Sequence, residues 1–344
     1  MKKIIKSIFI VVINIFIFLM LFIMLDYSFS LYQYKKQYEN VKNGTIGKEK
    51  TKLEFFKKNI YTGFKYWKFN KHFTSDFNFT DNYKGENKNK GAVILFGCSF
   101  AYGAFLGENQ NFSAKLSKLT GRTVFNRAMP SYGLGQMLWL TKQTEFYNNI
   151  EKINEGEKPD YVIYVYIPDH FMRSCRYKYG ISNPYYNNYY LSYDIKDGKL
   201  IETKPFLVEL NKFTIFFNLT NNLKCNKNHY DKGDYNNFEY IKLHFEHSRE
   251  ELRKRYPDIK FIIIKYPYNY GDLPDKMSQE YYNMSVYSSK RWKELQEEGF
   301  IIIEADKQTI GVNLNDEKYK LPDNHPNEAA WDIITPVIVK IADL

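Results

Sequence analysis

The sequence predicts an α/β domain with a mainly parallel sheet, preceded by a short apolar segment at the N-terminus. Five short and almost wholly apolar runs follow one another from residue 91 onward, as is typical of strands that are buried on both faces. Helical stretches separate these runs, and this alternation indicates βαβ units. A chain of 344 residues is long enough for one large domain of this kind with its own core.

The N-terminal residues 1–30 predict a transmembrane signal-anchor. Residues 7–25 carry no charge, and as a helix these 19 residues span about 29 Å, which matches a bilayer core. Lys2, Lys3 and Lys6 precede the run, which favours a cytoplasmic N-terminus and an extracytoplasmic domain. The alternative is a cleaved signal peptide, but the apolar region of such a peptide is usually shorter and ends in small residues.

The remainder of the chain divides into a stalk and a domain. Residues 31–60 are polar and lysine-rich and are expected to form the stalk, while the domain covers residues 61–344 with its core from residue 91. The expected strands are residues 91–97, 123–129, 161–167, 260–267 and 300–306. The expected helices lie near residues 109–121, 134–150, 235–256, 275–298 and 327–343.

Residues 176–206 do not fit the alternation and are expected to form an aromatic insertion. Asp197-Gly198 lies between two short apolar stretches and predicts a hairpin turn. The insertion closely follows the third strand, so its tyrosines, including Tyr185 and Tyr186, are candidates for a substrate-binding rim. The alternative is that these tyrosines only pack the insertion against its own domain.

Charge and cysteine content restrict the function classes. The net charge is +10, but lysine is scattered and no dense basic block or nucleic-acid motif occurs, so we expect no nucleic-acid partner. The three cysteines, Cys98, Cys175 and Cys225, match no metal or redox spacing. His244 and His247 could mimic two metal ligands on one helix, but without a third ligand a solvated helix face is the preferred interpretation.

Ser99 follows the first apolar run within two residues and precedes a predicted helix. Open α/β sheets bind their ligands at the carboxyl ends of their strands, so Ser99 is a candidate nucleophile whose own N–H can face a developing oxyanion. Taken alone, a glycine followed two residues later by serine is a weak signal. The alternative is a serine that only caps a helix.

A second candidate lies in the segment LPDNHPNEAAW, residues 321–331. A serine hydroxyl needs an adjacent base, and His325 can take its proton near neutral pH. Asp323 can hold the orientation and tautomer of the imidazole, as the carboxylate does in a Ser-His-Asp triad. The alternative is a helix-start turn that carries an incidental histidine.

Taken together, three ordered blocks resemble the SGNH/GDSL hydrolase superfamily. They are Gly97-Cys98-Ser99, the stretch from Asn126 to Gly133, and Asp323-Asn324-His325-Pro326-Asn327. The resemblance covers roughly residues 90–344. It implies a three-layer, flavodoxin-like α/β/α sandwich, here with the five predicted strands in its sheet, and an enzyme that needs no metal or organic cofactor. The predicted anchor would place this domain outside the cytoplasm.

The resemblance also implies the roles of individual residues. Ser99 would attack an acyl carbonyl, His325 would act as base and then as acid, and Asp323 would orient His325. The backbone N–H groups of Ser99 and Gly133 would form much of the oxyanion hole. The third block departs from the family pattern, because Tyr166-Ile167-Pro168-Asp169 lacks its glycine and asparagine. His170 or Arg173 is therefore a candidate for the missing oxyanion donor.

Three functions remain open at this point. The first is a serine esterase acting on acyl esters, above all acetyl esters, of a cell-envelope glycan or lipid. The second is an O-acyltransferase on an envelope polysaccharide that uses the same chemistry with a sugar hydroxyl in place of water. The third, of another class, is an inactive carbohydrate-binding protein tethered to the membrane.

Overall fold

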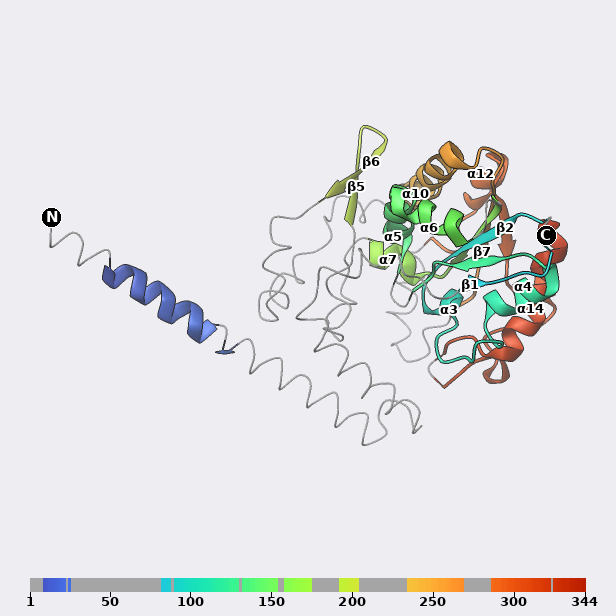
Figure 1. Ribbon diagram of the computed structural model, residues 1–344, viewed down its shortest axis with the longest axis horizontal. Helices are drawn as coiled ribbons and strands as arrows, with labels where there is room; N and C mark the ends of the chain where they lie inside the picture. The colour runs from blue at the N-terminus through green and yellow to red at the C-terminus, as the bar shows by residue number, and fades with distance from the viewer. Residues whose placement is uncertain are drawn as a thin grey trace. The chain divides into compact units, whose positions relative to one another are not determined.

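The computed structural model describes residues 9–22, 24–25, 82–87, 90–129, 132–153, 158–174, 192–203, 234–268, 286–322 and 324–344 (Figure 1). They belong to two compact units, of which one contains the N-terminal helix and the other contains the sheet. Each unit is described by itself.

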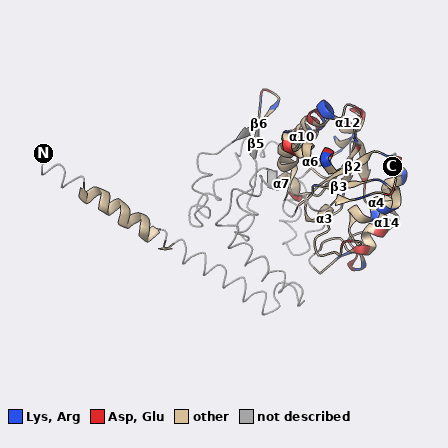
Figure 2. Ribbon diagram, in the orientation of Figure 1, with Lys and Arg blue, Asp and Glu red and all other residues tan. Residues whose placement is uncertain are grey.

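In the first unit, residues 9–22 and 24–25 are helical. This helix is tan in Figure 2 because it contains no charged residue. Its large apolar side chains are exposed, with Phe16 at 63% and Phe18 at 67%. Within the part of the chain that the structure describes, no helix combines the length and the apolar composition needed to cross a membrane.

The second unit is built on a six-stranded sheet in the order β1-β3-β2-β4-β7-β8. The strands are β1 (Asn82–Tyr83), β2 (Ala92–Phe96), β3 (Val124–Asn126), β4 (Pro159–Tyr166), β7 (Lys260–Lys265) and β8 (Ile301–Glu304). The last five are mutually parallel and coincide with the five predicted runs. The predicted mainly parallel α/β fold is confirmed.

The prediction of five strands is wrong by one, because β1 adds an antiparallel edge strand beside β3. β1 has only two residues, and it lies in a polar stretch without an apolar run or alternation. Its composition is that of a loop, so the sequence carries no signal for this strand.

Helices cover both faces of the sheet (Figure 1). One apolar cluster, on the face of Ile94 and Phe96, includes residues of α5 (Leu134–Thr141), α6 (Thr144–Ile153), α7 (Asp169–Ser174), α10 (Asp234–Arg255) and α12 (Trp292–Glu297). The other, on the face of Val93 and Leu95, includes residues of α3 (Ser99–Tyr102), α4 (Phe112–Thr120), α13 (Lys307–Ile310), the 3₁₀ helix η4 (Glu317–Tyr319) and α14 (Glu328–Ala342). This is the expected three-layer arrangement.

The predicted helix over residues 134–150 is instead two helices, α5 and α6. α5 is buried on nearly every side, whereas α6 buries only Phe146 and Ile150. At the end of α5, the Thr141 Oγ1 and the Gln143 Nε2 donate to the carbonyls of Leu138 and Trp139, which satisfies two of the terminal acceptors of the helix. The chain therefore stops and restarts without a glycine or proline that pattern analysis could use.

The predicted hairpin is confirmed as β5 (Ser192–Lys196) and β6 (Lys199–Thr203), with Asp197 and Gly198 both at positive φ in the turn. Tyr193 of β5 packs edge-on against His244 of α10, at a ring-centroid distance of 5.3 Å. His244 is fully buried, so the expected solvated helix face is wrong for this residue. Within the described residues, no group of three His, Cys, Asp or Glu side chains is arranged to hold a metal ion.

The strand order places one position at a topological switch. From β2 the chain crosses to β3 on one side, and from β3 it returns past β2 to β4 on the other side. In open α/β sheets, ligands bind outside the carboxyl ends of the strands at this reversal. The segment that leaves the carboxyl end of β2 begins with Gly97 and contains Ser99.

Candidate active site

The nucleophile turn, residues 97–103, holds Ser99 between β2 and α4. Gly97 has a φ of +146°, in the region that side chains rarely adopt. A Cβ atom at Gly97 would lie 2.8 Å from the Ala101 Cβ and 3.2 Å from the Val165 carbonyl oxygen. The close approach of strand and helix therefore requires glycine, and it presents Ser99 as the first, half-buried residue of α3.

The base loop, residues 320–327, brings His325 to this serine. The Nε2 of His325 lies 2.7 Å from the Oγ of Ser99. Ser99 can donate to Nε2 only when that nitrogen carries its lone pair, so the neutral imidazole must bear its proton on Nδ1. This is the contact that a serine nucleophile and its general base require, and it is the contact that the sequence predicts.

Backbone hydrogen bonds within the base loop fix the position of His325. The Leu321 N–H donates to the His325 carbonyl at 2.7 Å, and the Asn324 N–H donates to the Leu321 carbonyl at 2.9 Å. Asn324 has a φ of +66°, a left-handed conformation that asparagine tolerates better than most residues. The loop thus turns tightly immediately before the histidine.

Asn327 ties the base loop to the start of α14. Its Oδ1 accepts from the Ala330 N–H at 3.1 Å, which caps the helix. Its Nδ2 donates to the carbonyls of Lys318 and Lys320 at 2.8 and 3.3 Å. In the sequence, Asn327 was noted only as the last residue of a motif. Its hydrogen bonds to the base loop and to the start of α14 were not predicted.

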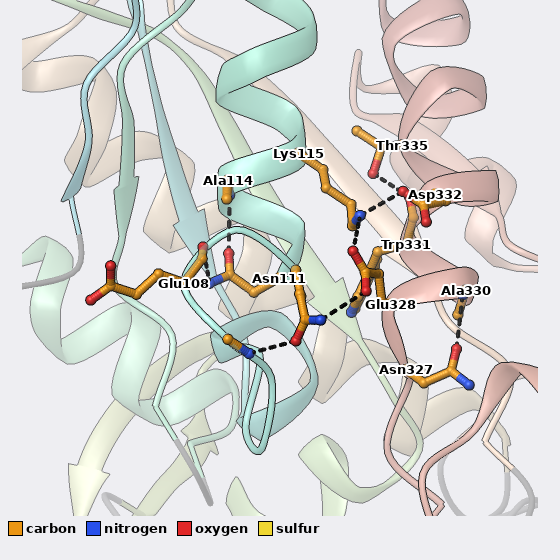
Figure 3. A network of polar contacts seen from close by, with 12 residues as sticks. Glu108, Asn111, Ala114, Lys115, Asn327, Glu328, Ala330, Trp331, Asp332 and Thr335 are labelled. Carbon is orange, nitrogen blue, oxygen red and sulfur yellow. Dashed lines mark hydrogen bonds and ion pairs between the residues drawn. The ribbon is translucent and has the colours of Figure 1, made fainter.

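A second clamp joins α4 to α14 (Figure 3). The Lys115 Nζ donates to the Asp332 Oδ1 at 2.5 Å and to the Glu328 Oε1 at 3.2 Å, while Gln110 Nε2 donates to the Glu328 Oε2 at 2.9 Å. Burial lowers the pKa of Lys115, but the hydrogen bonds and charges of Asp332 and Glu328 outweigh burial and raise it. The segment after Ser99 is therefore bonded to the helix that follows His325.

Two phenylalanines contact the imidazole of His325. The Phe100 ring is buried and lies 5.0 Å from the imidazole, and the Phe105 ring lies 5.4 Å away, nearly perpendicular to it. Phe105 is 45% exposed. Both residues lie within six positions of Ser99, but they show no helix or strand periodicity that could have indicated this contact.

The predicted oxyanion donors differ in how they are placed. The Ser99 N–H belongs to the first turn of α3 and has no acceptor within the described residues. The Gly133 N–H, in contrast, donates to the Gln136 Oε1 at 2.8 Å, so this bond would have to open before Gly133 could bind an oxyanion. The placement of Gly133 thus differs from the expected open donor.

The third-block candidates lie on α7. His170 is fully buried, with its Nδ1 2.9 Å from the Tyr164 hydroxyl and its ring packed edge-on against Tyr164 and Tyr166. Both tyrosines belong to the cluster on the α5 and α10 face of the sheet. Arg173 lies in α7, but its side chain is outside the described part of the structure, as are Asp323, Tyr185 and Tyr186.

Asn126 connects the second block to the nucleophile turn. It is buried at the carboxyl end of β3, and its Oδ1 accepts from the Ala128 N–H at 3.0 Å. Its Nδ2 faces the carbonyls of Ala101 and Tyr102 at 3.5 and 3.4 Å. Asn126 was predicted only as part of a motif. Its contact with the end of α3 follows from the structure and not from the sequence.

No protein-family model and no curated protein sequence matches this chain. Among solved structures, a protein described as a GDSL-like lipase from Bacteroides ovatus is similar, with 15% identity and a TM-score of 0.41 over 75% of this chain and 56% of that one. The chain thus spans little more than half the length of that protein. An acetylxylan esterase from Geobacillus stearothermophilus, solved as a catalytic mutant, has 12% identity and a TM-score of 0.40 over 73% of this chain and 95% of that one.

A third similar structure is a salicylyl-acyltransferase from a tetracycline biosynthetic pathway, with 10% identity and a TM-score of 0.38 over 74% of this chain and 54% of that one. These neighbours include GDSL-type hydrolases and an acyltransferase. At TM-scores below 0.5 they do not assign a reaction or a substrate to this chain.

Proposed function

We propose that this chain is an ester hydrolase or acyltransferase of the SGNH type, with Ser99 as nucleophile and His325 as its base. The observation that carries the proposal is the 2.7 Å contact between Ser99 Oγ and His325 Nε2 at the switch point of a parallel sheet. A serine that only caps a helix does not need a histidine from the far end of the chain.

The reaction proceeds in two balanced steps. In the first, the Ser99 Oγ bonds to the acyl carbon and passes its proton to the His325 Nε2, and the bond between the acyl carbon and the alcohol oxygen then breaks as that oxygen takes the proton. In the second, water or an acceptor hydroxyl gives its proton to His325 and attacks the acyl carbon. The Ser99 Oγ leaves and regains the proton.

The Ser99 N–H is the first donor for the oxyanion, because it is attached to the nucleophile and is not used within the helix. Gly133, His170 and Arg173 remain proposals for further donors, and Asp323 for the group that orients His325. For Gly133, the hydrogen bond to Gln136 implies that substrate binding must displace the glutamine side chain.

The proposed substrate is an acyl ester, above all an acetyl ester, of a cell-envelope glycan or lipid. This proposal is linked to anchoring of residues 7–25 in a membrane, with the enzyme domain outside the cytoplasm. The exposed apolar side chains of the N-terminal helix support anchoring, because a helix that is apolar all round needs an apolar environment. Carbonate extraction of membranes that carry the chain tests it, and release of the chain into the supernatant would contradict it.

Transfer to a sugar hydroxyl is the alternative outcome of the second step. The two outcomes differ only in which hydroxyl reaches the acyl-enzyme. Product analysis with an acetyl donor and a glycan acceptor measures the ratio of free acetate to acetylated glycan, and this ratio assigns the reaction.

The decisive experiment compares wild type with Ser99→Ala and His325→Ala in hydrolysis of p-nitrophenyl acetate by the full-length chain. We expect each substitution to lower kcat by at least about a thousandfold. Labelling by a fluorophosphonate, followed by mass spectrometry, should locate the label on Ser99. If wild type showed neither turnover nor labelling, the proposal of an enzymatic function would be wrong, and the alternative of a membrane-tethered carbohydrate-binding protein would be favoured.

A further inference from the structure

Phe105 combines three properties that a packing residue does not need. Its φ is +69°, in the left-handed region that is costly for a residue with a bulky side chain. Its ring is 45% exposed, although it is a large apolar side chain. The same ring touches the imidazole of the proposed base, with a centroid distance of 5.4 Å. Backbone strain of this kind persists where the surrounding structure holds it, which is often at functional sites.

The chemistry of the proposed reaction defines which part of the substrate lies on the Phe105 side. His325 gives its proton to the departing alcohol oxygen, so this oxygen must come within hydrogen-bond reach of Nε2. The acyl carbonyl oxygen points instead toward the oxyanion donors, beginning with the Ser99 N–H. A side chain that touches the imidazole is therefore close to the alcohol part of the ester and, in transfer, to the incoming acceptor.

We infer that the exposed Phe105 ring is the surface on which a pyranose ring of the alcohol part stacks while its oxygen exchanges a proton with His325. This inference rests on the proposed function and assigns the alcohol side of its substrate. Phe105 is thus a specificity-determining residue, and it acts on the sugar rather than on the acyl group.

Polar groups beside His325 favour a sugar over a long alkyl chain. Asn324 precedes His325, and its Oδ1 lies 3.5 Å from the Lys320 Nζ, which also pairs with Glu317 at 3.2 Å. A sugar presents C–H groups to an aromatic face and hydroxyls to polar neighbours of this kind.

The test compares two esters that form the same acetyl-enzyme, namely ethyl acetate and an O-acetylated methyl glucoside. Because both esters form the same acetyl-enzyme, any change in the ratio of their kcat/KM values arises before deacylation, in binding or in the acylation step that releases the alcohol. Full-length wild type is compared with Phe105→Ala, with Phe105→Leu, which keeps apolar bulk without an aromatic face, and with Phe105→Trp. Leu119→Ala, an exposed apolar position on α4, serves as the control for general surface effects.

We expect wild type to prefer the glucoside, and Phe105→Ala and Phe105→Leu to lower the glucoside-to-ethyl ratio about five- to tenfold. Phe105→Trp should retain most of the ratio, and Leu119→Ala should leave it unchanged. Fluorophosphonate labelling of Ser99 shows that each variant has an intact site, because fluoride is a leaving group too small to stack.

Several outcomes would overturn the inference. An equal loss on both esters would make Phe105 only a support for His325, and an unchanged ratio in Phe105→Ala would remove any contribution to specificity. If dodecyl acetate, and not the glucoside, depended on Phe105, an alkyl alcohol would replace the sugar. In all three cases Ser99 still labels and the proposed function stands. If wild type neither labels nor turns over, the proposed function itself fails and this inference fails with it.

Discussion

The nucleophile turn and the base loop reach the same point by different physical means. The nucleophile turn depends on backbone packing in the core, where Gly97 leaves no space for a side chain. The base loop depends on the hydrogen bonds of Asn327 nearer the surface, and the helix that follows it, α14, is paired with α4 through Glu328 and Lys115. We therefore expect the position of Ser99 to depend on close packing at Gly97, and the position of His325 to respond to single polar substitutions.

The largest effect is expected from Gly97→Ala, which disturbs the packing of the nucleophile turn. The strained φ and the contacts with Ala101 and Val165 should lower the free energy of unfolding by about 3 kcal/mol. Urea denaturation measures this loss. Gly299→Ala is the matched control, because Gly299 also has a positive φ but no atom within 4 Å of the added Cβ, and about 1 kcal/mol is expected there. Equal losses at both positions would show that close packing does not fix the nucleophile turn.

The base loop should respond to Asn327→Ala. Loss of the helix cap and of two bonds to the loop carbonyls should lower the free energy of unfolding by about 1–2 kcal/mol. It should also lower the rate of Ser99 labelling, because His325 loses its fixed position. Asp306→Ala removes a comparable cap from α13 and should cost stability without slowing labelling. Similar labelling rates in the two variants would contradict the role of Asn327 in the base loop.

The stability of the fold should depend on pH through His244, which is buried in α10 and is not part of the candidate site. Burial lowers the pKa of His244 from 6.5 to about 3. Below pH 6.5 the unfolded chain therefore binds a proton at this histidine, whereas the folded chain binds it only at much lower pH. Stability is therefore fully present above pH 6.5 and should fall by about 1 kcal/mol per pH unit below pH 6. Chemical denaturation of His244→Phe, measured from pH 7 to pH 4, should show a shallower slope. An unchanged slope would assign the acid sensitivity to other groups.

The smallest effect is expected from Lys115→Met, which removes the ion pairs between α4 and α14. Asp332 and Glu328 are partly exposed, so the loss should be about 0.5–1 kcal/mol and should shrink at high salt. Lys254→Met removes a pair within a single helix and is the control. If only Lys115→Met slows labelling of Ser99, the ion pairs contribute to the position of the base.

Sequence patterns were sufficient to predict the parallel strands and the hairpin, because these elements have regular local patterns. The five parallel strands are continuous apolar runs, and the hairpin at Asp197 and Gly198 has a characteristic turn. The serine and histidine were candidates because their chemistry requires particular residue types at strand ends, and the structure brings the two together. The two-residue strand β1, the break between α5 and α6, and the burial of His244 have no local pattern, since each depends on what packs against the segment.

The contacts that complete the site were equally hidden from the sequence. The Gly133 N–H donates to the side chain of Gln136, and Phe105 contacts His325 because its backbone adopts an unusual, left-handed conformation. Neither property follows from residue type or spacing. They arise because the loops are constrained at both ends by the sheet and the helices.

The Ser99–His325 contact joins residues 226 positions apart in the chain. Such a contact closes late in folding, because loop-closure entropy opposes it until the intervening strands have paired. A refolding chain should therefore bury the tryptophans of its core before it can react with a phosphonate. Reactivity at Ser99 thus reports completed assembly of the domain, and it distinguishes a finished molecule from a compact but incomplete one.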